Sequence, residues 1–288
     1  MNKLLGMSKS LSEKSIKGLY NPYELEWPDA LPEGDWCLSP ELISLHASLE
    51  YDAMDERDKK RLAFHEVLNL FSVTMHGERS LVSGLANYLY SDESFGTSEY
   101  IHHFLDEENK HMIYFGRFLN QYGKVYPDVF AGQKKVADRN YAEGEESLLF
   151  FIKAFVFELV SDEYNQVVAA DTRINDLVRY INHNHHVDES RHIAFGRQMI
   201  VDLYERGKAK WSADTMKGVR TYIAQFMNAL WGAFYNTEVY VDAGISNAKE
   251  LRDRVFSSQD AREFRALMSV RPQRFLCEIG VLEEPVTV

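Results

Sequence analysis

The 288-residue sequence is poor in cysteine and in basic residues. It has two cysteines, Cys37 and Cys277, which lie far apart and match no metal-binding or redox motif. We therefore expect reduced thiols in a cytoplasmic protein. The 32 Lys and Arg residues are outnumbered by 44 Asp and Glu, which gives a formal net charge of −12. This balance argues against nucleic acid as a partner, because phosphate contacts need clustered cations.

Long apolar runs are also missing. The N-terminal stretch MNKLLGMSKSLSEKS has no apolar run of signal-peptide length. Later segments never reach the roughly 18 uninterrupted apolar residues that indicate a transmembrane helix. We therefore expect a cytoplasmic protein without a membrane partner.

Proline and glycine are scarce, with 7 and 16 residues respectively, and the apolar segments between them are long. This pattern favours helices, and the alternation typical of β-sheets is missing. A short helix should start at Ser39-Pro40 and end near residue 51. Long helices are predicted over residues 55–91, 98–121, 145–170, 175–206 and 212–241.

We predict one all-α domain over residues 1–288, with a four-helix core and additional helices. Residues 1–38 should form an irregular arm, because Pro22, Pro28 and Pro32 interrupt any periodicity, and the aromatic residues of this arm should pack onto the body. The metal-binding core should span residues 55–241, followed by two short helices and a tail over 245–288. The aromatic side chains of the 212–241 helix are interpreted as core.

The most informative segment is residues 182–196, which contains Glu189 and His192 as a Glu-x-x-His pair and His185 one helical turn earlier. Since each helical residue advances by about 100°, these three side chains share an arc of about 60°. His183 and His186 fall outside that arc. The three residues form a candidate set of metal ligands.

Further ligands can be predicted from the positions of residues along the axes of antiparallel helices. Residues equidistant from a hairpin turn lie at the same height, because each helix rises by about 1.5 Å per residue. Glu158 precedes a turn near Arg173 by about as many residues as Glu189 follows it, so reflection through this turn pairs the two. Glu158 lies in the apolar run FIKAFVFELV. A carboxylate in such a run is costly unless it is paired or bound to a metal.

The first hairpin repeats this arrangement. Reflection of Glu78 through a turn near Glu93 gives Glu108, the first residue of a second Glu-x-x-His pair that ends at His111. A third pair, Glu99 and His102, reflects onto Asn87 and finds no carboxylate there. We therefore reject the third pair.

Four carboxylates and three imidazoles suit two iron or manganese ions in a helical bundle, and the lack of cysteine argues against structural zinc. The predicted ligands are Glu78, Glu108, His111, Glu158, His185, Glu189 and His192. Glu107 and Asp188 are predicted to accept hydrogen bonds from ligand imidazoles, and Asp162 is predicted to orient His185. Gly77 and Gly196 lie near ligands, and either access for O2 or close helix packing would explain them.

This doubled pattern resembles the p-aminobenzoate N-oxygenase (AurF-type) family. The resemblance rests on Glu78…Glu107-Glu108-Asn109-Lys110-His111 and on Glu158…Asp188-Glu189-Ser190-Arg191-His192, together with His185. It extends over roughly residues 60–240 through the helical layout. One departure is Glu107, where the family usually has Asp.

The resemblance implies a ferritin-like bundle that holds two iron ions and acts as an O2-dependent oxygenase. The substrate would be a small-molecule amine, such as an arylamine, oxidised toward hydroxylamine, nitroso or nitro. An external electron donor and a homodimer are also implied. The residues alone leave other functions open: a di-iron oxidase, desaturase or C–H hydroxylase, with a free or carrier-bound substrate, or a ferritin-like iron-binding protein. A mixed Fe/Mn pair would suit the ligands as well.

Overall fold

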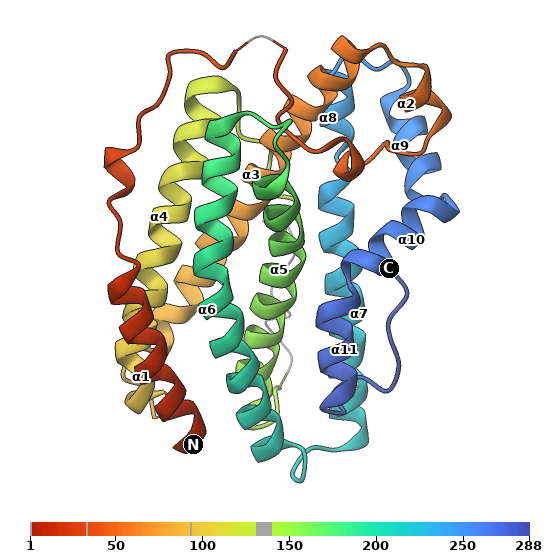
Figure 1. The fold of residues 1–288 in the computed structure, drawn as a ribbon. Helices are drawn as coiled ribbons and strands as arrows, with labels where there is room; N and C mark the ends of the chain where they lie inside the picture. Colours follow the sequence, from red (N-terminus) through yellow and green to blue (C-terminus); the bar gives the residue numbers. More distant parts are fainter. Residues whose placement is uncertain (1, 33, 93, 131–139) are drawn as a thin grey trace.

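The computed structural model describes residues 2–32, 34–92, 94–130 and 140–288. Four long helices form its centre: α3 (Glu56–Leu85), α4 (Ser98–Tyr122), α5 (Glu145–Ala170) and α6 (Asp176–Gly207) (Figure 1). Helix α3 pairs with α4, and α5 pairs with α6. Strands are absent from the described residues, where one isolated bridge joins Trp36 and Ile174. The predicted all-α bundle is therefore confirmed.

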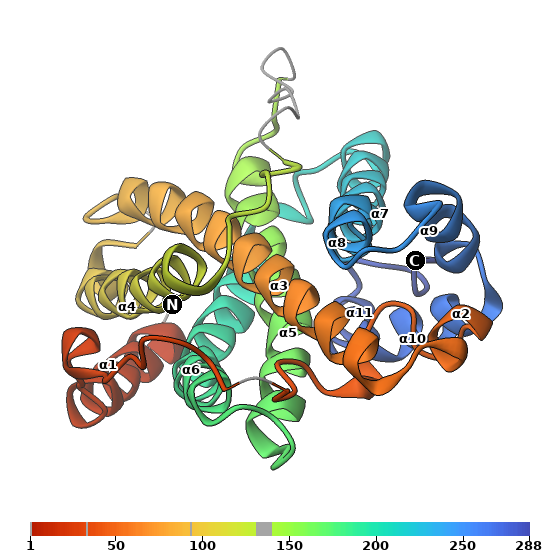
Figure 2. The ribbon, with the colours of Figure 1, turned by 90° about the horizontal axis from the view of Figure 1, so that it is seen from above.

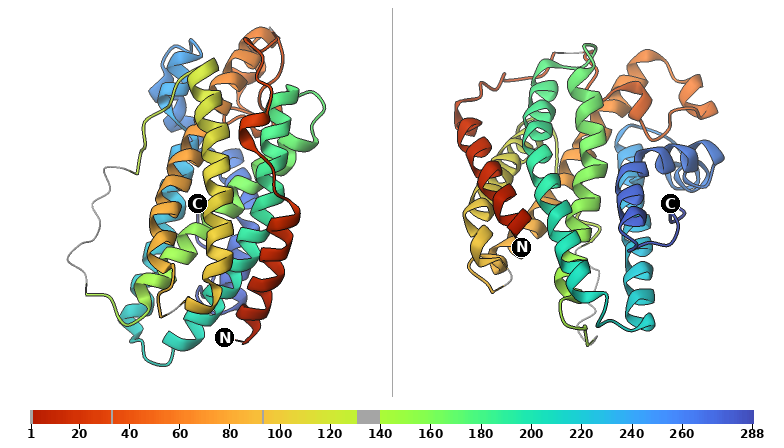
Figure 3. Two further views of the ribbon diagram at one scale, coloured as in Figure 1. Left: turned by 90° about the vertical axis from the view of Figure 1, so that its left-hand side faces the viewer. Right: turned by 60° about the horizontal axis from the view of Figure 1, so that its bottom comes forward.

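The remaining helices flank this bundle on two sides (Figure 2). Helix α1 (Asn2–Lys17) packs against α4 and α6, as the side view also shows (Figure 3). On the other side of α5 lie α7 (Ala213–Phe234), α8 (Thr237–Asp242), α9 (Ala248–Phe256), α10 (Gln259–Met268) and α11 (Val270–Glu278). Short α2 (Leu49–Ala53) precedes α3. Single 3₁₀ turns cover Pro22–Glu24, Pro40–Leu42, Ala86–Tyr88 and Phe95–Thr97.

Side-chain caps explain where several helices begin. The Asp55 side chain accepts a hydrogen bond from the backbone of Asp58 at the start of α3. Asn175 caps α6 in the same way, through the backbone groups of Leu177 and Val178. Such caps satisfy backbone N–H groups that a first helical turn leaves unpaired. The long helices therefore begin within a residue or two of their predicted starts.

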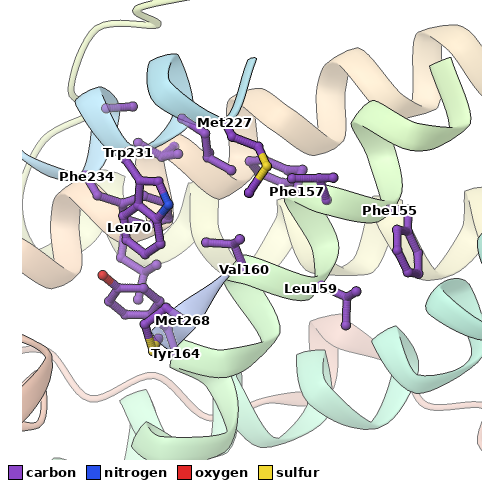
Figure 4. Close-up of a cluster of buried hydrophobic side chains, with 14 of the residues drawn as sticks. Leu70, Phe155, Phe157, Leu159, Val160, Tyr164, Met227, Trp231, Phe234 and Met268 are labelled. Atoms are coloured by element: carbon purple, nitrogen blue, oxygen red, sulfur yellow. The ribbon is translucent and has the colours of Figure 1, made fainter. Parts of the chain in front are cut away.

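Helix α5 lies at the middle of the hydrophobic core, between α6 and α7. On its α7 side, Tyr164 stacks on Phe234 with ring centroids 5.0 Å apart, and Trp231 packs near Phe234 (Figure 4). Phe155 points away from this cluster and contacts Phe275 of α11. Trp231 and Phe234 of α7 are thus core residues, as the sequence indicated, whereas Phe226 also lines a cavity.

The prediction of an irregular arm over residues 1–38 is wrong for its first half. Residues 2–17 form α1, whose buried face carries Leu4 and Leu11 together with the buried serines Ser8, Ser12 and Ser15. These positions recur at helical spacing, but serines hid the pattern because they are not apolar. The prolines that suggested an irregular segment start only at Pro22.

Further boundaries differ from the predictions, and the helix predicted over 55–91 ends at Leu85. Ser39 precedes only the 3₁₀ turn Pro40–Leu42, and its hydroxyl donates to Asp171 and does not cap that turn. The α-helix α2 begins only after Ser48. The 212–241 helix ends at Phe234, because the Asn236 side chain accepts from the backbone of Glu238 and starts α8. The C-terminal region has three short helices where two were predicted.

The predicted turn centre at Glu93 lies outside the described residues. None of the helices in the described part of the chain combines the length and the apolar character needed to span a membrane.

Two helical glycines provide a matched test of the packing between α3 and α5. A β-carbon at Gly84 would lie 2.0 Å from the Phe150 ring, whereas one at Gly6 of α1 would meet nothing within 4 Å. Helix propensity favours alanine by about 1 kcal/mol at both positions. We expect Gly6→Ala to raise the free energy of unfolding, and Gly84→Ala to lower it by about 1 kcal/mol or more through overpacking. Denaturant unfolding measures both, and equal effects would contradict the close contact.

Candidate metal centre

The seven predicted ligands converge inside the bundle, and none is more than 2% exposed. Glu78 comes from α3, Glu108 and His111 from α4, Glu158 from α5, and the remaining three from α6. Donor atoms of Glu78, His111 and His185 lie within 4.8 Å of one another, and so do those of Glu108, Glu189 and His192. The reflected positions therefore meet in space as two neighbouring groups of ligands.

Glu189 lies between the two groups. Its Oε1 is 3.1 Å from Nε2 of His185, 3.2 Å from Nδ1 of His192 and 3.6 Å from Nδ1 of His111. A third group, formed by Glu158, His185 and Glu189, shares two of these residues. A carboxylate in this position can serve two metal ions, as in the carboxylate centres of helical bundles.

Several polar atoms at the centre make no hydrogen bond to the protein. Within the described residues, both oxygens of Glu78 and Glu158, Nδ1 of His111 and Nε2 of His185 are buried without a hydrogen bond. Each such atom costs about 1–3 kcal/mol when it stays unsatisfied. Hard or borderline cations would satisfy them, since oxygen and imidazole donors suit iron and manganese. The residues present therefore fit a pair of these metals.

Electrostatics in the cluster point to the same conclusion. Burial, followed by the charges of Glu108 and Glu189, raises the pKa of Glu78 well above its ordinary value. The pKa of Glu158 is raised for the same reasons. Burial would lower the pKa of His192, but the surrounding carboxylates raise it well above the usual range. Without cations, the cluster therefore holds protons that metal ions would displace.

Carboxylates from the opposite hairpin orient the two Glu-x-x-His imidazoles. Nε2 of His111 on α4 lies 3.1 Å from Asp188 on α6, and Nε2 of His192 on α6 lies 2.8 Å from Glu107 on α4. Nδ1 of each ring then faces the cluster. Hydrogen bonds of this kind fix the tautomer and orientation of a ligand imidazole.

Arg191 joins the two orienting carboxylates, a role that the sequence analysis missed. Its Nη2 lies 2.6 Å from Glu107 and also contacts Asp188, and the residue is only 7% exposed. Burial raises the pKa of Asp188, but the hydrogen bond from His111 and the nearby cations lower it to about 2 overall. The signal in the sequence was an arginine directly before a predicted ligand histidine.

The prediction that Asp162 orients His185 is wrong. Asp162 lies 2.6 Å from Nδ1 of His186, outside the cluster, while the carboxamide of Asn165 lies 2.8 Å from Nδ1 of His185. Reflection through the turn gives the height of a residue along the helix axis but not the direction of its side chain. Asn165 therefore takes the place predicted for Asp162.

The rejected Glu-x-x-His pair does not belong to the buried ligand cluster. Glu99 and His102 are both exposed, and Nε2 of His102 lies 3.2 Å from the hydroxyl of Tyr90. Both side chains lie outside the groups of donor atoms found among the described residues.

A cavity of about 260 Å³ reaches the cluster at Glu158 and Gly77. Its walls carry Phe130, Phe150, Phe157 and Phe226, and its charged side chains include Arg79 and Lys153. Gly77 leaves no space for a ligand itself, because a β-carbon there would lie 2.1 Å from the Phe157 ring. Close helix packing therefore explains this glycine.

Two neighbouring histidines provide a test of the ligand set. His185 faces Glu78 and Glu189, whereas His186 points away and contacts Asp162. We expect His186→Ala to retain about two iron ions per chain, and His185→Ala to retain clearly fewer, because a ligand nitrogen is lost. Metal analysis after gel filtration measures the difference. Equal iron content in the two folded variants would remove His185 from the site.

Metal binding should release protons. Cations require ionised carboxylates and neutral imidazoles, whereas the raised pKa values of Glu78, Glu158 and His192 favour the protonated groups in the metal-free protein. The affinity for Fe(II) should therefore rise with pH and fall as the pH is lowered. Calorimetric titrations in two buffers with different ionisation enthalpies would measure the number of protons released. A buffer-independent binding enthalpy would contradict this coupling.

The fold is shared with proteins of low sequence identity. An R2-like ligand-binding oxidase from Sulfolobus acidocaldarius superposes with a TM-score of 0.50, at 15% identity over 93% of each chain. A variant of an R2-like ligand-binding oxidase with an anaerobically reconstituted Mn/Fe cofactor gives the same score and identity, over 90% of this chain and 92% of that one. At this identity the likeness shows the fold alone.

Comparisons of the sequence identify relatives and a family. Uncharacterized proteins from Mycobacterium bovis and Mycobacterium tuberculosis are each 25% identical over 204 residues. The match covers 67% of this chain and 59% of those relatives, so it spans less than two thirds of their length. Residues 5–280 match the family described as P-aminobenzoate N-oxygenase AurF. Since this match spans nearly the whole sequence, the chain belongs to the p-aminobenzoate N-oxygenase AurF family.

Proposed function

We propose that the chain is an O2-dependent oxygenase with two iron ions, and that it oxidises the nitrogen of a small-molecule amine. The observation that carries this proposal is the third imidazole. Nε2 of His185 lies 3.2 Å from Glu78 and 3.1 Å from Glu189, in addition to the two Glu-x-x-His pairs. This seventh donor, together with the family match, favours an oxygenase centre over generic iron storage.

When bound, the two irons would supply the redox chemistry that activates O2. Oxidation of an amine to a hydroxylamine by O2 takes two electrons and two protons from an external reductant and releases water. The protein would hold the imidazoles in place through Asp188, Glu107 and Asn165, and would keep bulk water from the buried ligands. A dry, prearranged site strengthens electrostatic interactions with the reacting groups.

The cavity beside Glu158 is a suitable place for the substrate. Its phenylalanine walls match the flat apolar surface of an aryl group, and its volume of about 260 Å³ suits a small molecule. Ligand sites in proteins are commonly apolar pockets with a few polar groups. An arylamine in this cavity would place its ring among the phenylalanines and its nitrogen toward the ligand cluster.

A second candidate is C–H hydroxylation or another di-iron oxidation, in which a mixed Fe/Mn pair could replace two irons. The apolar walls of the cavity favour it, because they would also accept a hydrocarbon substrate. Product analysis separates the two functions, since nitrogen oxidation leaves every C–H bond of an arylamine intact.

The decisive experiment uses iron-loaded protein, O2, a chemical reductant and a panel of arylamines, with products identified by mass spectrometry. We expect hydroxylamine, nitroso or nitro products from the wild-type protein and at least about a hundredfold less from His192→Ala, which loses a ligand. His102→Ala, from the exposed Glu-x-x-His pair, is the matched control and should keep full activity. Products oxidised only at carbon would contradict the proposed function.

A further inference from the structure

The segment after α1 reaches the carboxylates around the metal centre. The hydroxyl of Tyr20 donates a hydrogen bond of 3.0 Å to Oδ2 of Asp188. The same oxygen lies 3.1 Å from Nε2 of His111. Tyr20 therefore connects to the ligand His111 through two hydrogen bonds. It does so although it precedes the first bundle helix, α3, by more than thirty-five residues.

Tyr20 is held in this position from two further sides. Its ring stacks on Tyr114 with centroids 5.9 Å apart and planes 5° apart. The ammonium group of Lys110 lies 5.0 Å from the centre of the Tyr20 ring, in the range of cation–π contacts. Lys110 directly precedes His111, so the same turn of α4 supplies the ligand and supports Tyr20. Burial and the charge of Asp188 raise the pKa of Tyr20, so its phenol stays protonated and donates.

This contact makes the two halves of the centre unequal. Asp188, which orients His111, accepts from His111, from Arg191 and from Tyr20. Glu107, which orients His192, accepts from His192 and from Arg191. Among the described residues, Glu107 has no third donor corresponding to Tyr20. The N-terminal segment therefore supports only one of the two orienting carboxylates.

We propose that Tyr20 is a positioning residue for one metal ion, the one bound by His111, through its hydrogen bond to Asp188. The third donor holds Asp188 against His111 and withdraws charge from the carboxylate. Both effects reach the imidazole, because the basicity and orientation of a ligand histidine follow the hydrogen bond on its other nitrogen. This inference rests on the dinuclear centre of the proposed function.

The test uses the 288-residue chain loaded with ⁵⁷Fe(II) alone. Tyr20→Phe removes one hydroxyl and keeps the ring stack on Tyr114, while Tyr23→Phe removes a hydroxyl from the same segment at a residue that is 71% exposed. We expect Tyr20→Phe to bind two irons, to shift one of the two Mössbauer doublets, and to release one iron to a chelator up to about tenfold faster. Tyr23→Phe should match the wild type in each measurement.

The possible results distinguish a failure of the role of Tyr20 from a failure of the dinuclear centre. Unchanged spectra and release rates for Tyr20→Phe, or equal shifts of both doublets, would overturn the role of Tyr20 and leave the dinuclear centre intact. Wild-type protein that binds fewer than two irons would overturn the dinuclear centre, and with it the role of Tyr20. Near-ultraviolet circular dichroism on the same samples shows that each variant is folded.

Discussion

The structure depends on the burial of four carboxylates at one point inside a helical bundle. Glu78, Glu108, Glu158 and Glu189 are each no more than 2% exposed. Carboxylates this close repel one another, and burial adds the loss of hydration, so the group is unfavourable without protons or cations. Three imidazoles from α4 and α6 complete a donor set that two metal ions would satisfy. The rest of the bundle fixes these side chains in place.

Hydrogen bonds join the two helix hairpins at the ligand cluster. The ligand histidine of each hairpin is oriented by a carboxylate of the other hairpin, and Arg191 joins the two carboxylates. A shift of one hairpin relative to the other would break hydrogen bonds in both halves. The packing of α4 against α6 therefore bears directly on the geometry of the ligand side chains, and Tyr20 adds a hydrogen bond from the N-terminal segment.

Much of this arrangement could be predicted because helices have a fixed rise. Reflection through two turns brought Glu78 opposite Glu108 and Glu158 opposite Glu189, and it excluded Glu99. Side-chain direction could not be predicted in this way, which is why Asn165 and not Asp162 contacts His185. Helix α1 was missed because serines line its buried face, and Tyr20 because no short-range pattern links it to Asp188. The cavity depends on how Phe157 packs over Gly77, which only the folded chain shows.

The most direct test of the central claim is anomalous diffraction from a crystal of the iron-loaded protein, measured on both sides of the iron absorption edge. Two peaks are predicted, one among Glu78, His111 and His185 and the other among Glu108, Glu189 and His192. A single peak, or iron bound elsewhere on a folded chain, would contradict the dinuclear centre.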